Sequence, residues 1–121
     1  MLAIALSVGL MTGCGAIMRL TSDSGEAISF ANGELQSREP HAMALLDTAC
    51  ERAIASLGYD DVRSERGEKR VLWQARTAGG DHVEIRLSAN GAKRSTLLIR
   101  VGVLGDETRS RLLLEHIQQS L

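Results

Sequence analysis

Two stretches of the chain repeat apolar residues at the spacing of a helix. Between Pro40 and Leu57, apolar residues recur every three or four positions and charged residues occupy the other face, which predicts an amphipathic helix. Pro40 suits a first helical turn, and Gly58 suits the left-handed residue that ends a helix. The face expected to pack comprises Leu45, Leu46, Ala49, Cys50, Ala53, Ile54 and Leu57.

A second helix is predicted from Asp106 to Gln119. The Asp106 carboxylate is placed to accept a hydrogen bond from the first free backbone N–H groups of this helix. Leu113, Leu114 and Ile117 fall on one stripe, so this helix also has one apolar face.

Alternation with a period of two predicts strands in the rest of the chain. The clearest is 82–88, where apolar residues share one face and polar residues take the other. Gly79-Gly80-Asp81 before it and Asn90-Gly91 after it are hairpin signals. The other expected strands lie at 28–35 with a bulge or turn near Gly33, around Val62, at 71–76 with Val71, Trp73 and Ala75 inward, and at 96–103 with Leu97, Ile99, Val101 and Val103 inward.

The order of elements is therefore strand, helix, four strands, helix. An antiparallel sheet with one apolar face needs a cover, and two amphipathic helices are available to supply it. We expect an α+β fold, a two-layer sandwich in which an antiparallel sheet of four to five strands is covered on one face by two helices. Residues 27–121 are expected to form this single domain, without metal or disulfide staples.

The N-terminal stretch joins an apolar run to a cysteine. Residues 2–11 are fewer than the roughly 20 that span a bilayer as a helix, but they suit the apolar core of a secretory signal. Thr12-Gly13-Cys14 then resembles a bacterial lipobox. We expect a signal peptide at 1–13, followed by a lipidated cysteine and tether at 14–26.

Two features of this stretch depart from the usual signal. Met11 stands where lipoboxes prefer Leu, and no Lys or Arg lies before Cys14, which indicates a translation start upstream of Met1. The alternative is a buried helix over 2–18, which the glycines in that range disfavour.

Charge and cysteine content narrow the function classes. Fourteen basic and fifteen acidic residues give a net charge of −1, so no broad positive field attracts nucleic acid. The only cysteine besides Cys14 is Cys50. An acylated Cys14 leaves Cys50 without a disulfide partner, so we expect it to behave as a small buried apolar residue.

Two segments of the sequence resemble those of a known family. Ala31-Asn32-Gly33-Glu34-Leu35 and especially Arg100–Ser110, which reads RVGVLGDETRS, are similar to small bacterial envelope lipoproteins grouped as a domain of unknown function. The resemblance extends from Cys14 to Leu121, because the lipobox cysteine, tether, first strand, helix, further strands and closing helix follow one another in the same order. It departs after Cys14, where Arg19, Asp23 and Glu26 replace the Gly/Ala-rich apolar stretch that such proteins often carry. It implies a fold and an envelope address, and no activity.

Arg100, Gly102, Gly105 and Arg109 are candidates for contact with an anion or a partner. Backbone N–H groups at the start of a helix can face an anion. The alternative is a strand-to-helix turn in which the glycines give the backbone room and Asp106 itself takes the anion's place. Arg100 is expected on the outer face of the sheet near Arg86 and Glu84, where cross-strand charge pairing explains it without any ligand; the alternative is a carboxylate or phosphate partner.

The residues that catalysis or metal binding needs do not occur at suitable spacing. His41, His82 and His116 fall on three different elements and lack the short spacing of zinc-binding pairs. No Gly-x-Ser-x-Gly elbow occurs, and Cys50 is expected to face the core, as is Trp73. We therefore expect no enzyme, no metal and no cofactor.

Two functions fit these observations. The first is a non-catalytic envelope lipoprotein, in which acyl chains on Cys14 hold an accessory or docking domain at a membrane leaflet beside an unidentified envelope protein. The residue after Cys14 is Gly15 and not Asp. In a bacterium with two membranes, this resembles lipoproteins that are passed to the outer membrane, so we expect the domain there, facing the periplasm. The alternative is a periplasmic binder of a small apolar or anionic ligand, with a pocket between the face of Leu45, Cys50 and Ile54 and the strand of Val83, Ile85 and Leu87.

Overall fold

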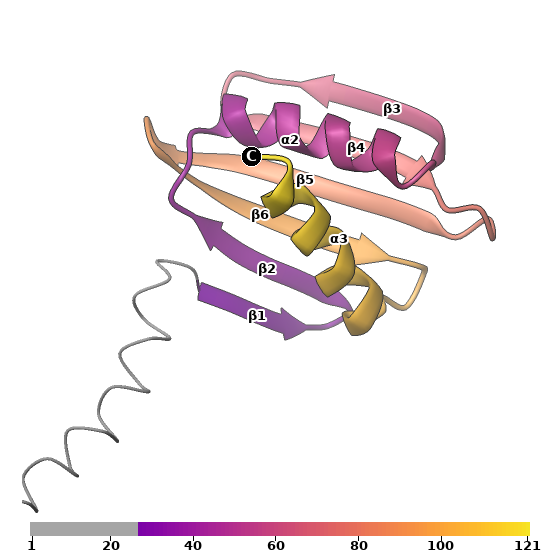
Figure 1. The fold of residues 1–121 in the computed structure, drawn as a ribbon. Coiled ribbons are helices and arrows are strands. Elements are labelled where there is room, and N and C mark those ends of the chain that lie inside the picture. Colours follow the sequence, from indigo (N-terminus) through magenta and orange to yellow (C-terminus); the bar gives the residue numbers. More distant parts are fainter. Residues whose placement is uncertain (1–26) are drawn as a thin grey trace, which may run out of the picture.

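The computed structural model describes residues 27–121, so the expected signal peptide, Cys14 and tether lie outside the described part. Residues 27–121 form an α+β two-layer sandwich (Figure 1). One antiparallel sheet has the strand order β1-β2-β6-β5-β4-β3, and the two helices lie on one of its faces. The elements are β1 (Ala27–Ala31), β2 (Glu34–Glu39), α2 (Met43–Ser56), β3 (Asp60–Arg66), β4 (Arg70–Arg76), β5 (His82–Gly91), β6 (Arg94–Val101) and α3 (Glu107–Gln119). The predicted fold class is confirmed, with six strands in place of four to five.

The additional strand arises because the stretch at 28–35 is a hairpin of β1 and β2. Asn32 and Gly33 have φ of 53° and 80°, as the two central residues of a type I′ turn require. Ala31 and Glu34 pair across this turn. The sequence left open a bulge or a turn near Gly33, and the structure has the turn.

α2 begins three residues later than predicted. Pro40 lies before the helix, because Ala42 is still extended, with ψ of 147°, and its carbonyl accepts the first helical hydrogen bonds. The carbonyl of His41 accepts instead from Ser95 Oγ of β6 at 2.8 Å. A tertiary contact thus holds the backbone ahead of the helix out of helical geometry. Gly58 ends the helix as predicted, with φ of 69°.

Two residues predicted to face the core are exposed. Leu45 is 47% exposed, whereas its neighbour Leu46 is fully buried, so the packing stripe of α2 is narrower than predicted. Val103 is 86% exposed because β6 ends at Val101 and the chain turns at Gly102.

The turn between β5 and β6 also differs from the prediction. The hairpin exists, but its two-residue turn is Ala92-Lys93, and Gly91 pairs with Arg94. The register shifts between Ala89 and Gly91, so the Asn90-Gly91 dipeptide forms a bulge in place of the turn.

The hydrophobic core lies between the sheet and the helices. α2 packs on β4 and β5, and α3 packs on β6 and β2 (Figure 1). The period-two alternation predicted for the central strands is confirmed, because all their inward side chains are buried: Val71, Trp73, Ala75, Val83, Ile85, Leu87, Leu97, Ile99 and Val101. No helix within residues 27–121 is long and apolar enough to cross a membrane.

Candidate functional site

The β1–β2 turn and the loop between β6 and α3 lie against each other at one end of the sheet. A Cβ added to Gly105 would overlap the Cα and carbonyl oxygen of Gly33, and a Cβ added to Gly33 would lie 2.6 Å from Arg100 Nη1 and overlap the carbonyl of Leu104. Only glycine at both positions permits this approach. We call this contact of 32–34 with 100–106 the glycine junction.

Arg100 connects the two sides of the glycine junction. Its Nη2 donates to the carbonyl of Asn32 at 2.9 Å, and its Nη1 donates to the carbonyl of Val103 at 3.4 Å. Glu34 Oε2 lies 3.9 Å from Arg100 Nη2 and balances its charge. The guanidinium is thus already occupied by the protein's own backbone and by one carboxylate.

The N–H groups of the two glycines in the β6–α3 loop are occupied as well. Gly102 N–H donates to the carbonyl of His82 at 2.7 Å, and Gly105 N–H donates to the carbonyl of Gly102 at 3.3 Å. Asp106 Oδ1 accepts from Arg109 N–H at 3.0 Å, which confirms Asp106 as the cap of α3. This arrangement agrees with the turn interpretation of the loop.

The side chain of Arg109 has a different partner from that of Arg100. It is on the first turns of α3, where its Nη1 donates to Asp81 Oδ2 of the β4–β5 turn at 2.8 Å. That hydrogen bond raises the pKa of the Arg109 guanidinium. The structure therefore brings Arg100, Gly102 and Gly105 together and places Arg109 in a separate ion pair.

The loop of the glycine junction presents two apolar side chains to solvent. Val103 and Leu104 are 86% and 88% exposed. The carbonyls of these two residues face the protein, since Arg100 binds one and Gly33 abuts the other. The loop thus has a fixed backbone beneath an apolar tip.

The face of the sheet opposite the helices carries a network of ion pairs. Glu84 lies opposite Arg100 in the β5–β6 register. Arg86 pairs with Glu34 and, at 3.2 Å, with Glu84. Charge pairing across β2, β5 and β6 therefore accounts for these residues without a carboxylate or phosphate ligand.

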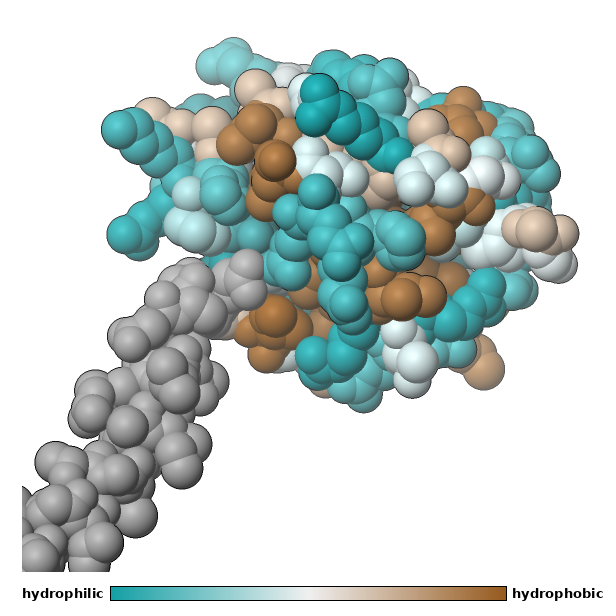
Figure 2. Space-filling model, in the orientation of Figure 1, coloured by the Kyte–Doolittle hydropathy of each residue, from teal (hydrophilic) through white to brown (hydrophobic). Residues whose placement is uncertain are grey.

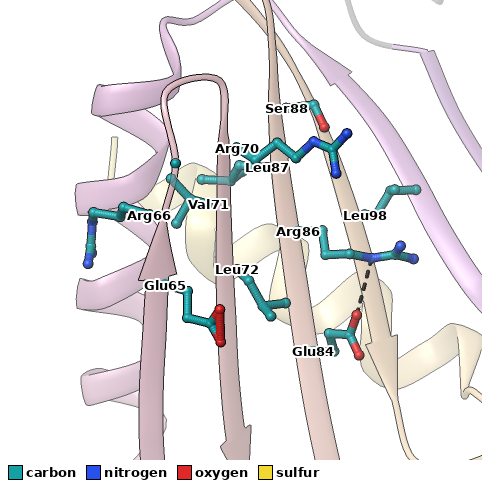
Figure 3. A pocket seen from close by; sticks show the side chains of 11 residues that line it. Glu65, Arg66, Arg70, Val71, Leu72, Glu84, Arg86, Leu87, Ser88 and Leu98 are labelled. Atoms are coloured by element: carbon teal, nitrogen blue, oxygen red, sulfur yellow. Dashed lines mark ion pairs between the residues drawn. The ribbon is translucent and has the colours of Figure 1, made fainter.

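A shallow hollow of about 530 Å³ lies on the same face, over β4 and β5 (Figure 3). Leu72 and Leu98 contribute apolar surface to it, and Figure 3 shows Arg70 extended across the sheet towards Ser88. Within residues 27–121, Arg70 makes no ion pair. The hollow is open to solvent and combines one available cation with apolar surface.

Residues 1–120 match the family described as "Protein of unknown function (DUF3568)". The chain belongs to this family. No curated protein matches it. The two segments on which the family resemblance rests, 31–35 and 100–110, form the two sides of the glycine junction. In this member of DUF3568, these two segments therefore contact each other.

Asp47 of α2 is a polar centre that the sequence analysis missed. Its carboxylate accepts from Arg66 Nε at 2.7 Å, from Arg66 Nη2 at 3.0 Å and from Trp73 Nε1 at 2.8 Å. The Arg66 guanidinium also lies 5.1 Å from the centroid of the Trp73 ring. The hydrogen bond to Asp47 raises the pKa of Arg66. This cluster fastens edge strand β3 to the helix above it.

The Asp47 cluster yields a prediction on stability. Asp47→Ala leaves the buried indole N–H of Trp73 without an acceptor, and we expect a loss of about 1–2 kcal/mol in the free energy of unfolding. Asp47→Asn is the matched control, because its amide oxygen can still accept from the indole, so a smaller loss is expected. Urea denaturation followed by the fluorescence of the chain's one tryptophan measures both variants. Equal losses would contradict the assigned role of the indole hydrogen bond.

Glu39 is a second polar residue that the sequence analysis missed. It is 2% exposed at the end of β2, and Ser37 Oγ and Gln118 Nε2 donate to its Oε2. The signal was available, because Leu35, Ser37 and Glu39 share one parity and therefore one face of the strand.

The structure also places the cysteine, histidine and acidic side chains that were considered as catalytic or metal-binding groups. Within 27–121, no group of three or more His, Cys, Asp or Glu side chains is arranged to hold a metal ion. Burial, with a smaller contribution from the charge of Asp47, raises the pKa of the Cys50 thiol, which disfavours the reactive thiolate. The space expected to form a ligand pocket is filled by core side chains, including Cys50, Ile54 and Ile85, each at most 2% exposed.

Proposed function

We propose that the protein is a lipid-anchored bacterial envelope protein without catalytic activity, which serves as an accessory or docking module at a membrane leaflet. The observation that carries this proposal is the apolar run that ends in Thr12-Gly13-Cys14, ahead of a domain whose core is built within residues 27–121.

Acyl chains on Cys14 would supply the membrane attachment. Each buried methylene contributes about 0.8 kcal/mol, so two or three chains hold a domain at a leaflet essentially permanently. Attachment also raises the local concentration of the domain near any membrane partner. In a host with two membranes, Gly15 after Cys14 favours the outer membrane, with the domain facing the periplasm.

The packing of the domain supports docking over enclosure of a ligand. The side chains between α2 and β5 fill their space, and the hollow of about 530 Å³ lies on the open face of the sheet. The alternative function, binding of a small anionic ligand, is favoured by one observation, which is that the Arg70 side chain lines the same hollow as the apolar side chains of Leu72 and Leu98. That ligand would rest on the open face, away from the helices.

The lipid anchor is tested by metabolic labelling with palmitate and by membrane fractionation. The full gene, including any in-frame start upstream, is expressed as wild type, as Cys14→Ala and as Cys50→Ala. We expect label in the membrane fraction for wild type and Cys50→Ala and no label for Cys14→Ala, because Cys50 is buried in the core. Unlabelled wild-type protein in the soluble fraction would contradict the proposal.

A further inference from the structure

The two edge strands of the sheet differ in how they discourage further pairing. β3 carries Asp60, Asp61, Arg63, Glu65 and Arg66 in seven residues, and its register shifts between Asp60 and Arg63. Charges and bulges of this kind protect an edge strand against pairing with another chain. β1 reads AISFA, with no charge, no proline and an unbroken register against β2. The β1 edge therefore lacks the protection that the β3 edge has.

The backbone of β1 offers a defined set of free hydrogen-bonding groups. In a two-residue hairpin, the residues beside the turn exchange hydrogen bonds, and such pairs then alternate along an antiparallel ladder. Ala31, Ser29 and Ala27 therefore bond to β2. The N–H and C=O groups of Ile28 and Phe30 point to the outer edge, where β1 has no neighbouring strand within the described residues.

Within residues 27–121, the outer edge of β1 is also open to approach. Among the strands, α3 packs mainly on β2 and β6, and β1 lies beyond them at the edge of the sheet. Ile28 is 39% exposed, and Phe30 is partly buried against the core. Figure 2 shows hydrophobic surface over β1, at the lower side of the domain. A strand that approaches this edge meets free backbone groups beside apolar side chains.

We propose that the outer edge of β1 pairs antiparallel with β1 of a second copy of this chain, which joins two six-stranded sheets into one. In the symmetric register, Ser29 faces Ser29 of the second copy and Ile28 faces Phe30. This register satisfies all the outward groups, since Ile28 and Phe30 of each copy exchange four hydrogen bonds.

The side chains fit this register without any charged or bulky mismatch. Ile28 and Phe30 stand opposite Ser37 and Leu35 of β2, which are buried on the helix side, so both apolar side chains lie on that side. Across the symmetric pair, they form one apolar cluster that extends the core. Ser29 faces itself on the open side, and Ala27 faces Ala31. The neutral sequence is thus complementary to itself, which favours a second copy over a strand of different charge pattern.

The paired segment is short, so we expect a weak dimer whose population rises with the protein concentration. Stable interfaces bury about 1,200–2,000 Å² in total, which a five-residue strand alone does not approach. A covalent trap is therefore the appropriate test, because it records a weak but specific contact.

The test is disulfide crosslinking of Ser29→Cys in the full chain that also carries Cys14→Ser, so that buried Cys50 is the only other thiol. Facing residues that do not exchange hydrogen bonds bring their Cβ atoms to about 4.5–5.5 Å, close to what a disulfide needs. We expect copper-phenanthroline to convert Ser29→Cys to a covalent dimer at least tenfold faster than Ser64→Cys. Ser64 is a matched control, since it is an exposed serine near the middle of the opposite edge strand.

The register is tested by a second pair of variants. Ala27→Cys alone should not crosslink, because the symmetric pairing places the two copies of this residue about 14 Å apart, at about 3.4 Å per residue along each strand. Mixed with Ala31→Cys, it should form a disulfide between the two variants. Self-crosslinking of Ala27→Cys as fast as Ser29→Cys would overturn the symmetric register.

Ile28→Pro tests the backbone contribution in the Ser29→Cys chain. Proline removes the outward N–H and leaves the hydrogen bonds between β1 and β2 in place, as edge strands tolerate. We expect a crosslinking rate at least tenfold lower, with an unchanged circular dichroism spectrum; Ile28→Lys, which adds a charge to the edge, should act alike. Equal rates for Ser29→Cys and Ser64→Cys, or capture of a protein of another size by Ser29→Cys in cells, would overturn the proposal. Because Cys14 is absent from the test, its result is independent of the lipid anchor.

Discussion

Gly105→Ala is expected to lower the free energy of unfolding by about 3 kcal/mol or more. The new Cβ would overlap the backbone of Gly33, which is not the movable end of a side chain, and Gly105 has φ of +85°. Overpacking and a left-handed conformation at a non-glycine residue each cost on the order of 1–3 kcal/mol. Relief requires the β1–β2 turn to move away from the β6–α3 loop, which also breaks the hydrogen bond from Arg100 to Asn32.

Gly102→Ala is the matched control for this prediction. Gly102 lies in the same loop with φ of +84°, but a Cβ there meets no atom within 4 Å. Its expected loss is about 1–2 kcal/mol, which is the left-handed penalty alone. Urea denaturation of both variants, followed by tryptophan fluorescence, separates the two contributions. If the two losses are equal, the close contact between Gly33 and Gly105 does not contribute to stability as we describe.

The glycine junction also shows which part of the candidate site the sequence could not predict. Each turn was visible locally, because Asn32-Gly33 and Asp106 carry known turn and cap signals. Their meeting depends on the pairing of β2 with β6, two strands that are far apart in the sequence. Without that strand order, Arg100 could be placed on the outer face, but its bonds to the carbonyls of Asn32 and Val103 could not be foreseen.

Elements with strong local periodicity were predicted together with their buried faces, whereas β3 was predicted only as a strand around Val62, without its partners. β5 and α3 bury the apolar positions that their sequences indicate. β3 has little apolar alternation, and its residues are exposed; its attachment comes from Arg66 reaching Asp47 on α2 and from pairing with β4. Such a strand gives no periodic signal, because its stability resides in partners that a single sequence does not identify.

Leu46→Ala is expected to lower the free energy of unfolding by about 3 kcal/mol. The side chain of Leu46 is fully buried between α2 and the sheet, and removal of a buried leucine side chain costs about 2–5 kcal/mol through lost transfer free energy and a residual cavity. The sequence pattern assigned Leu45 and Leu46 to the same packing face, so on that basis both alanine variants should be strongly destabilised. The structure predicts a large difference between them.

Leu45→Ala should change the free energy of unfolding by less than about 1 kcal/mol, since surface substitutions usually have small effects and alanine favours the helix. Leu45 is the matched control because it has the same side chain, one position away on α2, with 47% of its surface exposed. Chemical denaturation of the two variants compares them directly. Losses of similar size would mean that Leu45 is covered by something outside residues 27–121, such as a partner on the outer face of α2. A difference of 2 kcal/mol or more, on the order that cavity formation adds, would place the boundary of the core between these two residues.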